Sequence, residues 1–357
     1  MPNAGLINTV FAIALVLILG WLLYIGQGIL LPIFAAVICV YILNTGAAVL
    51  ARQPLLRRFP TWLLRILVLF GFTLALLCMV LIFRVTVLQM ETAAPTYQAN
   101  LERLVASVSL GLGFEDSPTW DEISAATVDR IDVEKLLGLL LASITSFGGT
   151  VFAIALYAGF LFSERAGFEG KLQAAFPGDR DHRLLKILND INEHIGDYLT
   201  VKTMINVVLA LVSYVVMWAM DVDFAPYWAL QIGVLNYIPY VGSVLGVAFP
   251  VILSLAQFGS LPETLALMAL LTFAQFFMGN IIEPRVIGKQ LNLSPFVVLI
   301  ALSVWGALWG IPGAILAVPM TSVIVIVCEG FPETRFIAIL LSDRVGDEAG
   351  AKAAPPA

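Results

Sequence analysis

Hydrophobic and charged positions along the chain are segregated into long blocks. No Asp, Glu, Lys or Arg precedes Arg52, and further charge-free runs cover 203–220, 224–262, 264–282 and 290–328. Apolar runs of about 18 residues or more are long enough to cross a bilayer as helices. The pattern therefore predicts an all-α polytopic membrane protein with about 8 transmembrane segments. Besides the later interrupted runs, helices are expected at about 6–25, 29–50, 62–90, 141–163 and 203–220.

Two of the runs are too long for one straight helix. Runs 224–262 and 290–328 each hold 39 uncharged residues. A continuous helix of that length would extend roughly 58 Å, against roughly 30 Å of hydrocarbon. Both runs are interrupted near their middles by Pro and Gly, in "NYIPYVGSVLG" and in "WGALWGIPGAILAVP". We therefore expect a helical break in each run, within either a re-entrant hairpin or a crossing.

The order of the runs suggests an internal repeat. Each broken run follows a plain span, which gives two similar segments, 203–262 and 263–329. If each broken run is a hairpin that enters and leaves on one side, the two segments have opposite orientations. Hairpins would also keep the two basic residues of "EPRVIGK" (283–289) in the cytoplasm, as the positive-inside rule expects. This interpretation is an inverted repeat in the C-terminal half.

Composition supports a membrane protein and excludes several kinds of site. Sixty per cent of the residues are hydrophobic and 12% are charged, whereas soluble chains carry about 25% charged residues. The three cysteines have no CxxC spacing and the two histidines have no ligand spacing. Nucleotide-binding, zinc-protease and serine-hydrolase motifs are absent from the sequence. We expect no metal, no cofactor, no nucleic-acid partner and no catalytic residues, so the chain is not predicted to be an enzyme.

Charge along the chain predicts its topology. The short basic loop "RQPLLRR" (52–58) places the amino terminus in the cytoplasm. Segment 91–136 holds nine acidic and three basic residues, and "TWDE" at 119–122 has capping-box spacing. The predicted parts are transmembrane helices in 1–90, an acidic extracytoplasmic helical insert in 91–136, a transmembrane helix in 137–163, a cytoplasmic amphipathic helical segment in 164–202, a transport core in 203–329 and a flexible cytoplasmic tail in 330–357.

Several stretches of the chain also carry a family resemblance. They are "LLPIFAAVICVYILN" (30–44), "YLTVKTMIN" (198–206), "LNYIPYVGSVLG" (235–246), "NIIEPRVIGKQLNLSPFVVLIAL" (280–302) and "GIPGAILAVP" (310–319). Together, in this order, they resemble the autoinducer-2 exporter family of bacterial membrane proteins. Members usually have Pro where this chain has Ser243, and often Met where it has Ala314. Neither change removes a break, but both leave the substrate open.

The resemblance implies a transporter of the bacterial inner membrane, and the charge pattern of this multi-pass chain places both termini in the cytoplasm. Roles within that family include export of the furanone signal autoinducer-2 and, for other members, sodium or lithium/proton exchange. The expected partners are the lipid bilayer and a small-molecule solute. Protons or sodium are candidate coupling ions, and further copies of the chain are candidate subunits.

The breaks also indicate where a solute would bind. Non-helical backbone at membrane depth is tolerated where it is buried in protein or lines a watery cavity, and many transporters build their sites from such broken elements. Gln275, Gly279 and Glu283 recur at helical spacing and share one face. The candidate pathway residues are Asn236, Tyr237, Pro239, Tyr240, Gly242, Gln275, Asn280, Glu283, Pro284, Arg285, Trp309, Pro312 and Gly313.

Two of these assignments leave alternatives open. Glu283 is the candidate coupling residue, since an ionisable group in a membrane segment is costly and typically functional. A structural ion pair between Glu283 and Arg285 or Lys289 is equally compatible with the sequence. Trp305 and Trp309, four residues apart, suit either stacking on a ring-shaped solute or simple packing.

Three functions are therefore compared. The leading hypothesis is a secondary transporter that exports small polar metabolites or signalling molecules, such as autoinducer-2, by alternating access. The alternative is a sodium or lithium/proton antiporter, which needs a carboxylate deep in the bundle, and no Asp or Glu stands at the centre of any run. The alternative of another class is a passive channel or membrane scaffold, which saturable counterflow would distinguish from a carrier.

Overall fold

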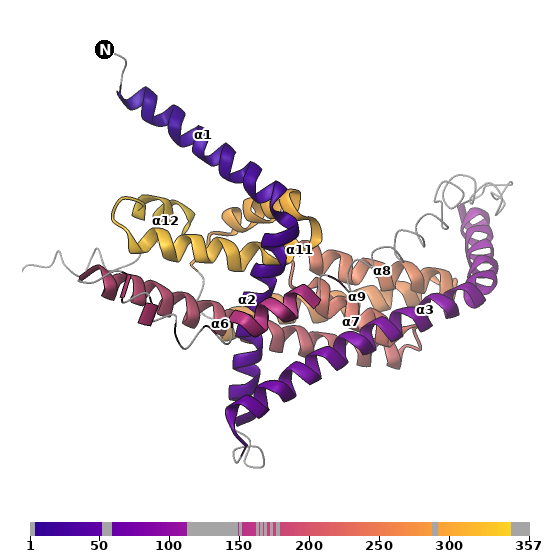
Figure 1. Cartoon of the computed structure of the whole chain (residues 1–357). Helices are drawn as coiled ribbons and strands as arrows, with labels where there is room; N and C mark the ends of the chain where they lie inside the picture. The colour runs from indigo at the N-terminus through magenta and orange to yellow at the C-terminus, as the bar shows by residue number, and fades with distance from the viewer. Residues whose placement is uncertain are drawn as a thin grey trace, which may run out of the picture. The chain divides into compact units, whose positions relative to one another are not determined.

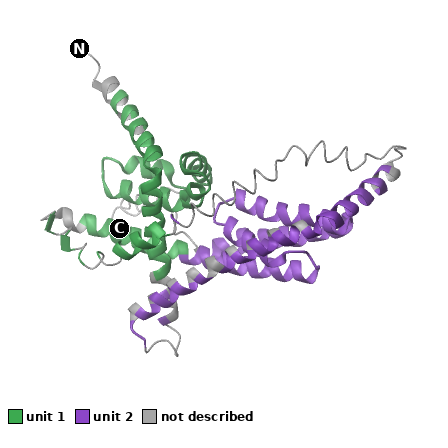
Figure 2. Ribbon diagram, turned by 45° about the vertical axis from the view of Figure 1, so that its right-hand side comes forward, with its two compact units in different colours: residues 1–45, 150–199, 289–357 green, residues 46–149, 200–288 purple. Residues whose placement is uncertain are grey.

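A computed structural model of the chain describes residues 4–51, 59–112, 152–161, 179–287 and 292–343, together with isolated positions at 149, 164, 167, 170–171 and 174–175. Every regular element within these residues is helical (Figure 1). The chain divides into two compact units. Unit 1 comprises 1–45, 150–199 and 289–357, and unit 2 comprises 46–149 and 200–288 (Figure 2).

Unit 2 holds the first of the two broken runs. Its helices are α3 (Thr61–Leu112), the second part of α6 (Asp179–Ala219), α7 (Ala225–Leu235), α8 (Val241–Phe258), α9 (Leu261–Phe277), the π-helix η1 (Met278–Ile282) and α10 (Glu283–Ile287). Helices α7, α8 and α9 pack in sequence, and α3 lies along α7 and α8 (Figure 1). The buried core is supplied by apolar side chains of α6, α7, α9 and η1, among them Ile205, Leu209, Met217, Ile232, Leu267, Leu271 and Met278.

The run 224–262 forms a helical hairpin. Helix α7 ends at Leu235, and α8 begins at Val241 after a tight turn that contains Pro239. A side chain at Gly242 would place its Cβ 1.8 Å from the carbonyl oxygen of Leu235, so this close approach of two backbones requires glycine. The two ends of the hairpin also meet. Gln257 near the end of α8 donates from Nε2 to the Asp221 carbonyl oxygen, which precedes α7, at 2.7 Å.

Unit 1 holds the second broken run. Its helices are α1 (Ala4–Ile25), the first part of α2 (Gln27–Ala51), the first part of α6, α11 (Pro295–Gly330) and α12 (Arg335–Leu341). Helix α12 packs along α11, and α1 also contacts α11. The Tyr41 hydroxyl on α2 donates to Oδ1 of Asn192 on α6 at 2.6 Å.

Helix α11 doubles back on itself. Gly310 has φ 64° and ψ −146°, which interrupts the helical backbone at the predicted break. Nε1 of Trp305 donates to Oγ1 of Thr321 at 3.1 Å, although the residues are 16 apart in sequence. A straight helix would separate them by roughly 24 Å. Gly313 allows the return, because a Cβ there would lie 2.0 Å from the Trp305 carbonyl oxygen.

Both runs are therefore broken where the sequence predicted. Among the described residues, four helices are long and apolar enough to cross a membrane: Arg183–Ala219, Val241–Phe258, Leu261–Val286 and Pro295–Gly330. The pair Ile13–Ile25 and Gln27–Leu43, bent by 85°, makes a fifth if it is counted as one span. The multi-span helical class is confirmed, whereas the number of eight spans and the inverted repeat stay predictions.

Several predicted boundaries differ from the helices observed. From Asp179 onward, the charged segment continues without a break into the span predicted at 203–220, since α6 runs for 41 residues from Asp179 to Ala219. The range 330–357, predicted to be a flexible tail, contains α12, which the Ser294 amide anchors by donating to the Leu341 carbonyl oxygen at 3.1 Å. Helix α3 continues past residue 90 to Leu112. The rest of the acidic insert, with the "TWDE" box, lies outside the described residues, as do 344–357.

Candidate functional site

A cavity of about 720 Å³ lies within unit 2, beside the first hairpin. Its walls come from α6, from the turn and first half of α8, and from α9, η1 and α10. Six residues predicted from the sequence line it: Asn236, Pro239, Tyr240, Gln275, Asn280 and Glu283. The lining also includes Lys202, Ser243 and Gly279. The helix face formed by Gln275, Gly279 and Glu283 therefore borders a single cavity.

The turn of the hairpin is held by a chain of amide and hydroxyl groups. Nδ2 of Asn236 donates to Oδ1 of Asn206 on α6 at 2.8 Å, and the Ser243 hydroxyl donates to Oδ1 of Asn236 at 3.3 Å. Tyr240 has φ 61° and ψ −57°, an unfavourable conformation for a side chain of this size. Strained residues of this kind concentrate at functional sites. The turn thus combines a fixed polar network with local strain at the cavity wall.

Buried amide groups near the cavity lack hydrogen-bond partners. Gln275 is 8% exposed, and its Nε2 has no partner among the described residues; the same holds for Nδ2 of Asn206. Gln275 packs over Gly246, since a Cβ on that glycine would lie 3.5 Å from Nε2. An unsatisfied buried amide costs about 1–3 kcal/mol. Gln275 lines the cavity, but its Nε2 is enclosed, so a solute that accepts a hydrogen bond would remove that cost only after the side chain turns toward the cavity.

A buried ion pair lies at the same cavity. Nζ of Lys202 on α6 is 2.7 Å from Oε1 of Glu283, with side-chain exposures of 4% and 23%. The π-helix η1 immediately precedes Glu283. An extra residue per turn rotates the side chains that follow it, and such insertions are frequent at functional sites. The pair places one positive and one negative charge beside a cavity whose lining is mostly apolar, with a few polar groups.

The partner of Glu283 differs from the expectation. The sequence suggested an ion pair with Arg285 or Lys289, and for Arg285 this was wrong. Residues two apart on a helix point in different directions, and Pro284 and Arg285 are exposed on α10. Lys289 lies outside the described residues. Lys202, which sequence reasoning missed, is part of "YLTVKTMIN" and is the last charge before the run 203–220, so its position carried a usable signal.

Other predicted residues serve the hairpins themselves. The Tyr237 hydroxyl is 2.7 Å from Oγ1 of Thr203 on α6, and Gly242 closes the α7–α8 hairpin. In unit 1, Trp309 is 4% exposed, donates from Nε1 to the Leu23 carbonyl oxygen at 3.0 Å and packs against Phe34. Pro312 and Gly313 follow the break at Gly310. Burial of Trp309 favours the packing interpretation over an open stacking surface.

Comparisons with known proteins bear on what this arrangement does. Residues 11–333 match the family described as AI-2E family transporter. The chain belongs to this family. It is accordingly a multi-pass membrane transporter of a bacterial type, which lies in the lipid bilayer and handles small solutes. The resemblance seen in the sequence motifs is thereby confirmed.

Individual relatives of this AI-2E family member agree. The chain is 29% identical over 350 residues to the "AI-2 transport protein TqsA" of Escherichia coli K12, covering 94% of this chain and 98% of TqsA. It is 34% identical over 199 residues to a Borreliella burgdorferi protein named "Putative transport protein". That match covers 56% of this chain and about half, 55%, of the Borreliella protein. The names of these relatives describe transport proteins.

Proposed function

We propose that this AI-2E family member is a secondary transporter that exports small polar metabolites or signalling molecules, with autoinducer-2 as the first solute to test. The observation that carries the proposal is the cavity of about 720 Å³, bordered by a broken hairpin and by the buried pair Lys202–Glu283. TqsA, which the chain matches over 94% of its length, is named an AI-2 transport protein.

The chemistry of the cavity suits a neutral solute rich in hydroxyl groups. Asn280, Ser243 and Tyr240 line the cavity with donor and acceptor groups, and the enclosed Gln275 amide becomes a further donor if its side chain turns toward the solute. The cavity charges sum to zero, because the Lys202 ammonium is balanced by the Glu283 carboxylate. A neutral polar solute can bind there without separating the pair, whereas a strongly charged one would have to compete with it.

Alternating access would use the hairpins as moving elements. In the inverted-repeat arrangement the α7–α8 hairpin enters from outside and the α11 hairpin from inside. Two features support re-entrance. Gln257 links the two ends of the α7–α8 hairpin, and Leu293 and Glu329, at the two ends of α11, line one cavity in unit 1. A run that crossed the bilayer would carry its ends to opposite faces.

Coupling to protons would pass through Glu283. Protonation of its carboxylate would remove the negative partner of Lys202, and the buried ammonium would then favour a different arrangement of α6 and α10. This couples the charge state of one side chain to the conformation of the cavity wall. The antiporter alternative would use the same carboxylate to exchange sodium or lithium for protons.

Transport in proteoliposomes tests the proposal. The purified full chain should show saturable counterflow of autoinducer-2, because a carrier exchanges internal for external solute through one site. A linear, unsaturable flux would favour the passive channel. Sodium- or lithium-dependent proton movement without autoinducer-2 counterflow would favour the antiporter. Absence of all three activities, with intact protein in the membrane, would contradict a transport function.

A further inference from the structure

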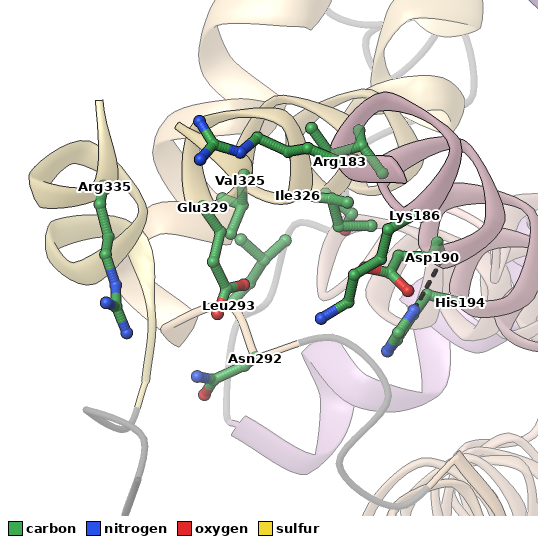
Figure 3. Close-up of a pocket in the computed structure, with 13 residues that line it drawn as sticks. Arg183, Lys186, Asp190, His194, Asn292, Leu293, Val325, Ile326, Glu329 and Arg335 are labelled. Atoms are coloured by element: carbon green, nitrogen blue, oxygen red, sulfur yellow. Dashed lines mark hydrogen bonds between the residues drawn. The ribbon is translucent and has the colours of Figure 1, made fainter. Parts of the chain in front are cut away.

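A second cavity, of about 770 Å³, lies within unit 1, and the proposed transport route does not use it. Its walls come from α6, from the segment before α11, from the last turns of α11 and from the start of α12. Figure 3 shows Arg335 of α12 on one side and Lys186 and His194 of α6 on the other, with Glu329 and Leu293 between them. The volume falls in the range of small-molecule sites, about 300–1,000 Å³.

The cavity carries surplus positive charge. Arg183, Lys186 and Arg335 line it together with the carboxylates Asp190 and Glu329, so three positive and two negative charges leave a net charge of +1. The whole chain, by contrast, has a net charge of −6. The two ion pairs seen within the described residues, Lys171–Glu164 and Lys202–Glu283, involve none of these side chains. The cavity cations are therefore not neutralised by a direct ion pair with a described carboxylate.

His194 adds a further polar group with a defined orientation. Its Nδ1 lies 2.7 Å from the carbonyl oxygen of Asp190 (Figure 3). A carbonyl oxygen can only accept, so Nδ1 donates and carries the proton. Nε2 is then an acceptor in the neutral ring. It suits a ligand hydroxyl, while the Asp190 and Glu329 carboxylates would accept from further hydroxyls.

The cavity is held open by ordered backbone. Thr334, next to Arg335, donates from Oγ1 to the Cys328 carbonyl oxygen at 2.9 Å. The amide of Asp343 donates to the Asn292 carbonyl oxygen at 3.3 Å, which ties the end of α12 to the segment before α11. A Cβ on Gly330 would lie 2.3 Å from Cδ1 of Ile187, so a larger residue there would push into the α6 wall. The backbone that carries Arg335 is thus held beside the last turns of α11.

Apart from Asn292 and Ser322, the remaining wall is apolar. Ile187, Leu293, Val325 and Ile326 line the cavity between the charged groups. A ligand that fills the space must therefore present both an anionic group and hydrocarbon. Guanidinium and ammonium groups together bind phosphate oxygens well, because each phosphate offers several strong acceptors to charged donors.

We propose that this cavity binds an organic phosphate ester that carries hydroxyl groups and an apolar part. The phosphate contacts Arg183, Lys186 and Arg335, the hydroxyls contact His194 and the two carboxylates, and the apolar part lies on Val325 and Ile326. The headgroup and first acyl carbons of an anionic glycerophospholipid have this chemistry, and soluble glycerol 3-phosphate presents the same phosphate and hydroxyl groups without the apolar part. Occupation would link α6, α11 and α12 and so stabilise unit 1.

Two binding measurements distinguish the sources. In the first, delipidated full-length protein in detergent is titrated with glycerol 3-phosphate, followed by calorimetry. In the second, the protein is placed in nanodiscs of phosphatidylcholine with or without phosphatidylglycerol, and retained lipid is counted by native mass spectrometry. Binding in the first arm identifies a soluble ester, and selective phosphatidylglycerol retention in the second identifies a lipid headgroup. Absence of saturable binding in both arms overturns the proposal.

Variants test whether the cavity is the site. The double variant K186Q/R335Q should weaken binding about tenfold or more, since it removes two charge-assisted hydrogen bonds. Arg103→Gln, at an exposed cation of unit 2, is the matched control and should bind as the parent does. Glu329→Gln should tighten binding severalfold, because the amide keeps an oxygen that accepts from a ligand hydroxyl and removes the negative charge that repels the phosphate. A misfolded variant cannot bind more tightly than the parent, so the gain expected for Glu329→Gln cannot arise from misfolding. Equal affinity in the parent protein and the three variants overturns the proposal.

Discussion

Nζ of Lys202 lies 2.7 Å from Oε1 of Glu283, and these residues are 81 apart in the sequence. The ammonium is nearly enclosed, with 4% of its side chain exposed, whereas Glu283 retains 23% and faces the cavity. Breaking a buried ion pair by removing one partner costs about 3–5 kcal/mol, because the remaining charge is left uncompensated. The ion pair therefore links α6 to α10. It also places an ionisable carboxylate, that of Glu283, at the cavity wall.

Neutralising Glu283 should impair transport and also lower the stability of unit 2, because the buried Lys202 ammonium loses its counter-charge. Glu283→Gln keeps the volume and a hydrogen-bonding oxygen for Lys202, but it cannot be protonated or deprotonated. We expect counterflow in proteoliposomes to fall by about tenfold or more, equivalent to about 1.4 kcal/mol in the barrier, and its pH dependence to disappear. Glu263→Gln, at an exposed carboxylate in the first turn of α9, is the control and should behave as the parent protein.

Replacing Lys202 tests the contribution of the ion pair to the stability of unit 2. Lys202→Met should destabilise unit 2, since it leaves Glu283 without its cation, and the double variant K202M/E283Q should recover part of the melting temperature. Additive losses in the double variant would contradict a direct energetic link between the two residues. Unchanged flux and pH dependence in Glu283→Gln would reject the coupling role.

Both hairpins should depend on one glycine each. Gly242→Ala and Gly313→Ala would force a Cβ to 1.8 Å and 2.0 Å from the carbonyl oxygens of Leu235 and Trp305. The backbone cannot move aside as a flexible side chain can. We therefore expect the free energy of unfolding to fall by about 3 kcal/mol or more in each variant. Gly306→Ala is the matched control in α11, where the nearest atom to the added Cβ is 3.9 Å away. Thermal unfolding in detergent measures the difference.

The Trp305–Thr321 hydrogen bond should stabilise the folded-back form of α11. Trp305→Phe removes the indole donor and leaves the buried Thr321 hydroxyl without it, at a cost of about 1–3 kcal/mol. Thr321→Ser retains the hydroxyl and should cost less. If both variants have the same melting temperature as the parent protein, the packing of the two halves of α11 does not depend on this hydrogen bond.

The broken runs were predictable because length and Pro/Gly content are local properties. A 39-residue uncharged run cannot cross the bilayer as one straight helix, and Pro239 and Gly310 stand where the helices break. The unbroken course of α6 was harder to predict. A change from charged to apolar composition near residue 202 suggested a boundary, although no Gly or Pro lies between Asp197 and Ala219 to end the helix.

The partner of Glu283 could not be predicted by proximity in sequence. Which cation reaches a carboxylate depends on how α6 packs against α9 and η1, and that packing is set by apolar residues such as Ile205, Leu209 and Leu271. The cavity of unit 1 was missed for a similar reason. Its cations come from α6 and α12, separated by about 150 residues, and α12 lies in a range predicted to be a flexible tail.

A polar cluster at one end of unit 2 should stabilise the α7–α8 hairpin. The Tyr97 hydroxyl donates to Oδ2 of Asp223 at 2.6 Å, and the Asp223 amide donates to Oε1 of Gln257 at 2.8 Å. Burial and the hydrogen bond to Asp223 raise the pKa of Tyr97 above its ordinary value. The donating form, and its stabilisation, therefore persist below the ordinary tyrosine pKa of about 10 and are lost as pH rises through the raised pKa.

Tyr97→Phe should accordingly lower the unfolding free energy by about 1 kcal/mol at neutral pH. Gln257→Leu should cost more, since Gln257 bonds both Asp221 and Asp223. Gln98→Leu is the control, because its exposed side chain bonds Glu102 within α3 alone among the described residues. Chemical denaturation at pH 7 measures these differences, and equal midpoints for the three variants would show that the cluster does not hold the hairpin.

The orientation of the two hairpins can be tested by cysteine accessibility. If both runs are re-entrant, residue 260 lies outside and residue 289 inside; if both cross the bilayer, the two positions exchange sides. In a background with Cys39, Cys78 and Cys328 replaced by serine, Ser260→Cys should react with a membrane-impermeant maleimide added to intact cells. Lys289→Cys should react after the membrane is opened. The bond from Gln257 to the Asp221 carbonyl oxygen joins the two ends of the α7–α8 hairpin, so in the re-entrant arrangement an Asp221→Cys variant should label as Ser260→Cys does. Labelling of residue 289, but not of residue 260, from outside would reject the inverted repeat.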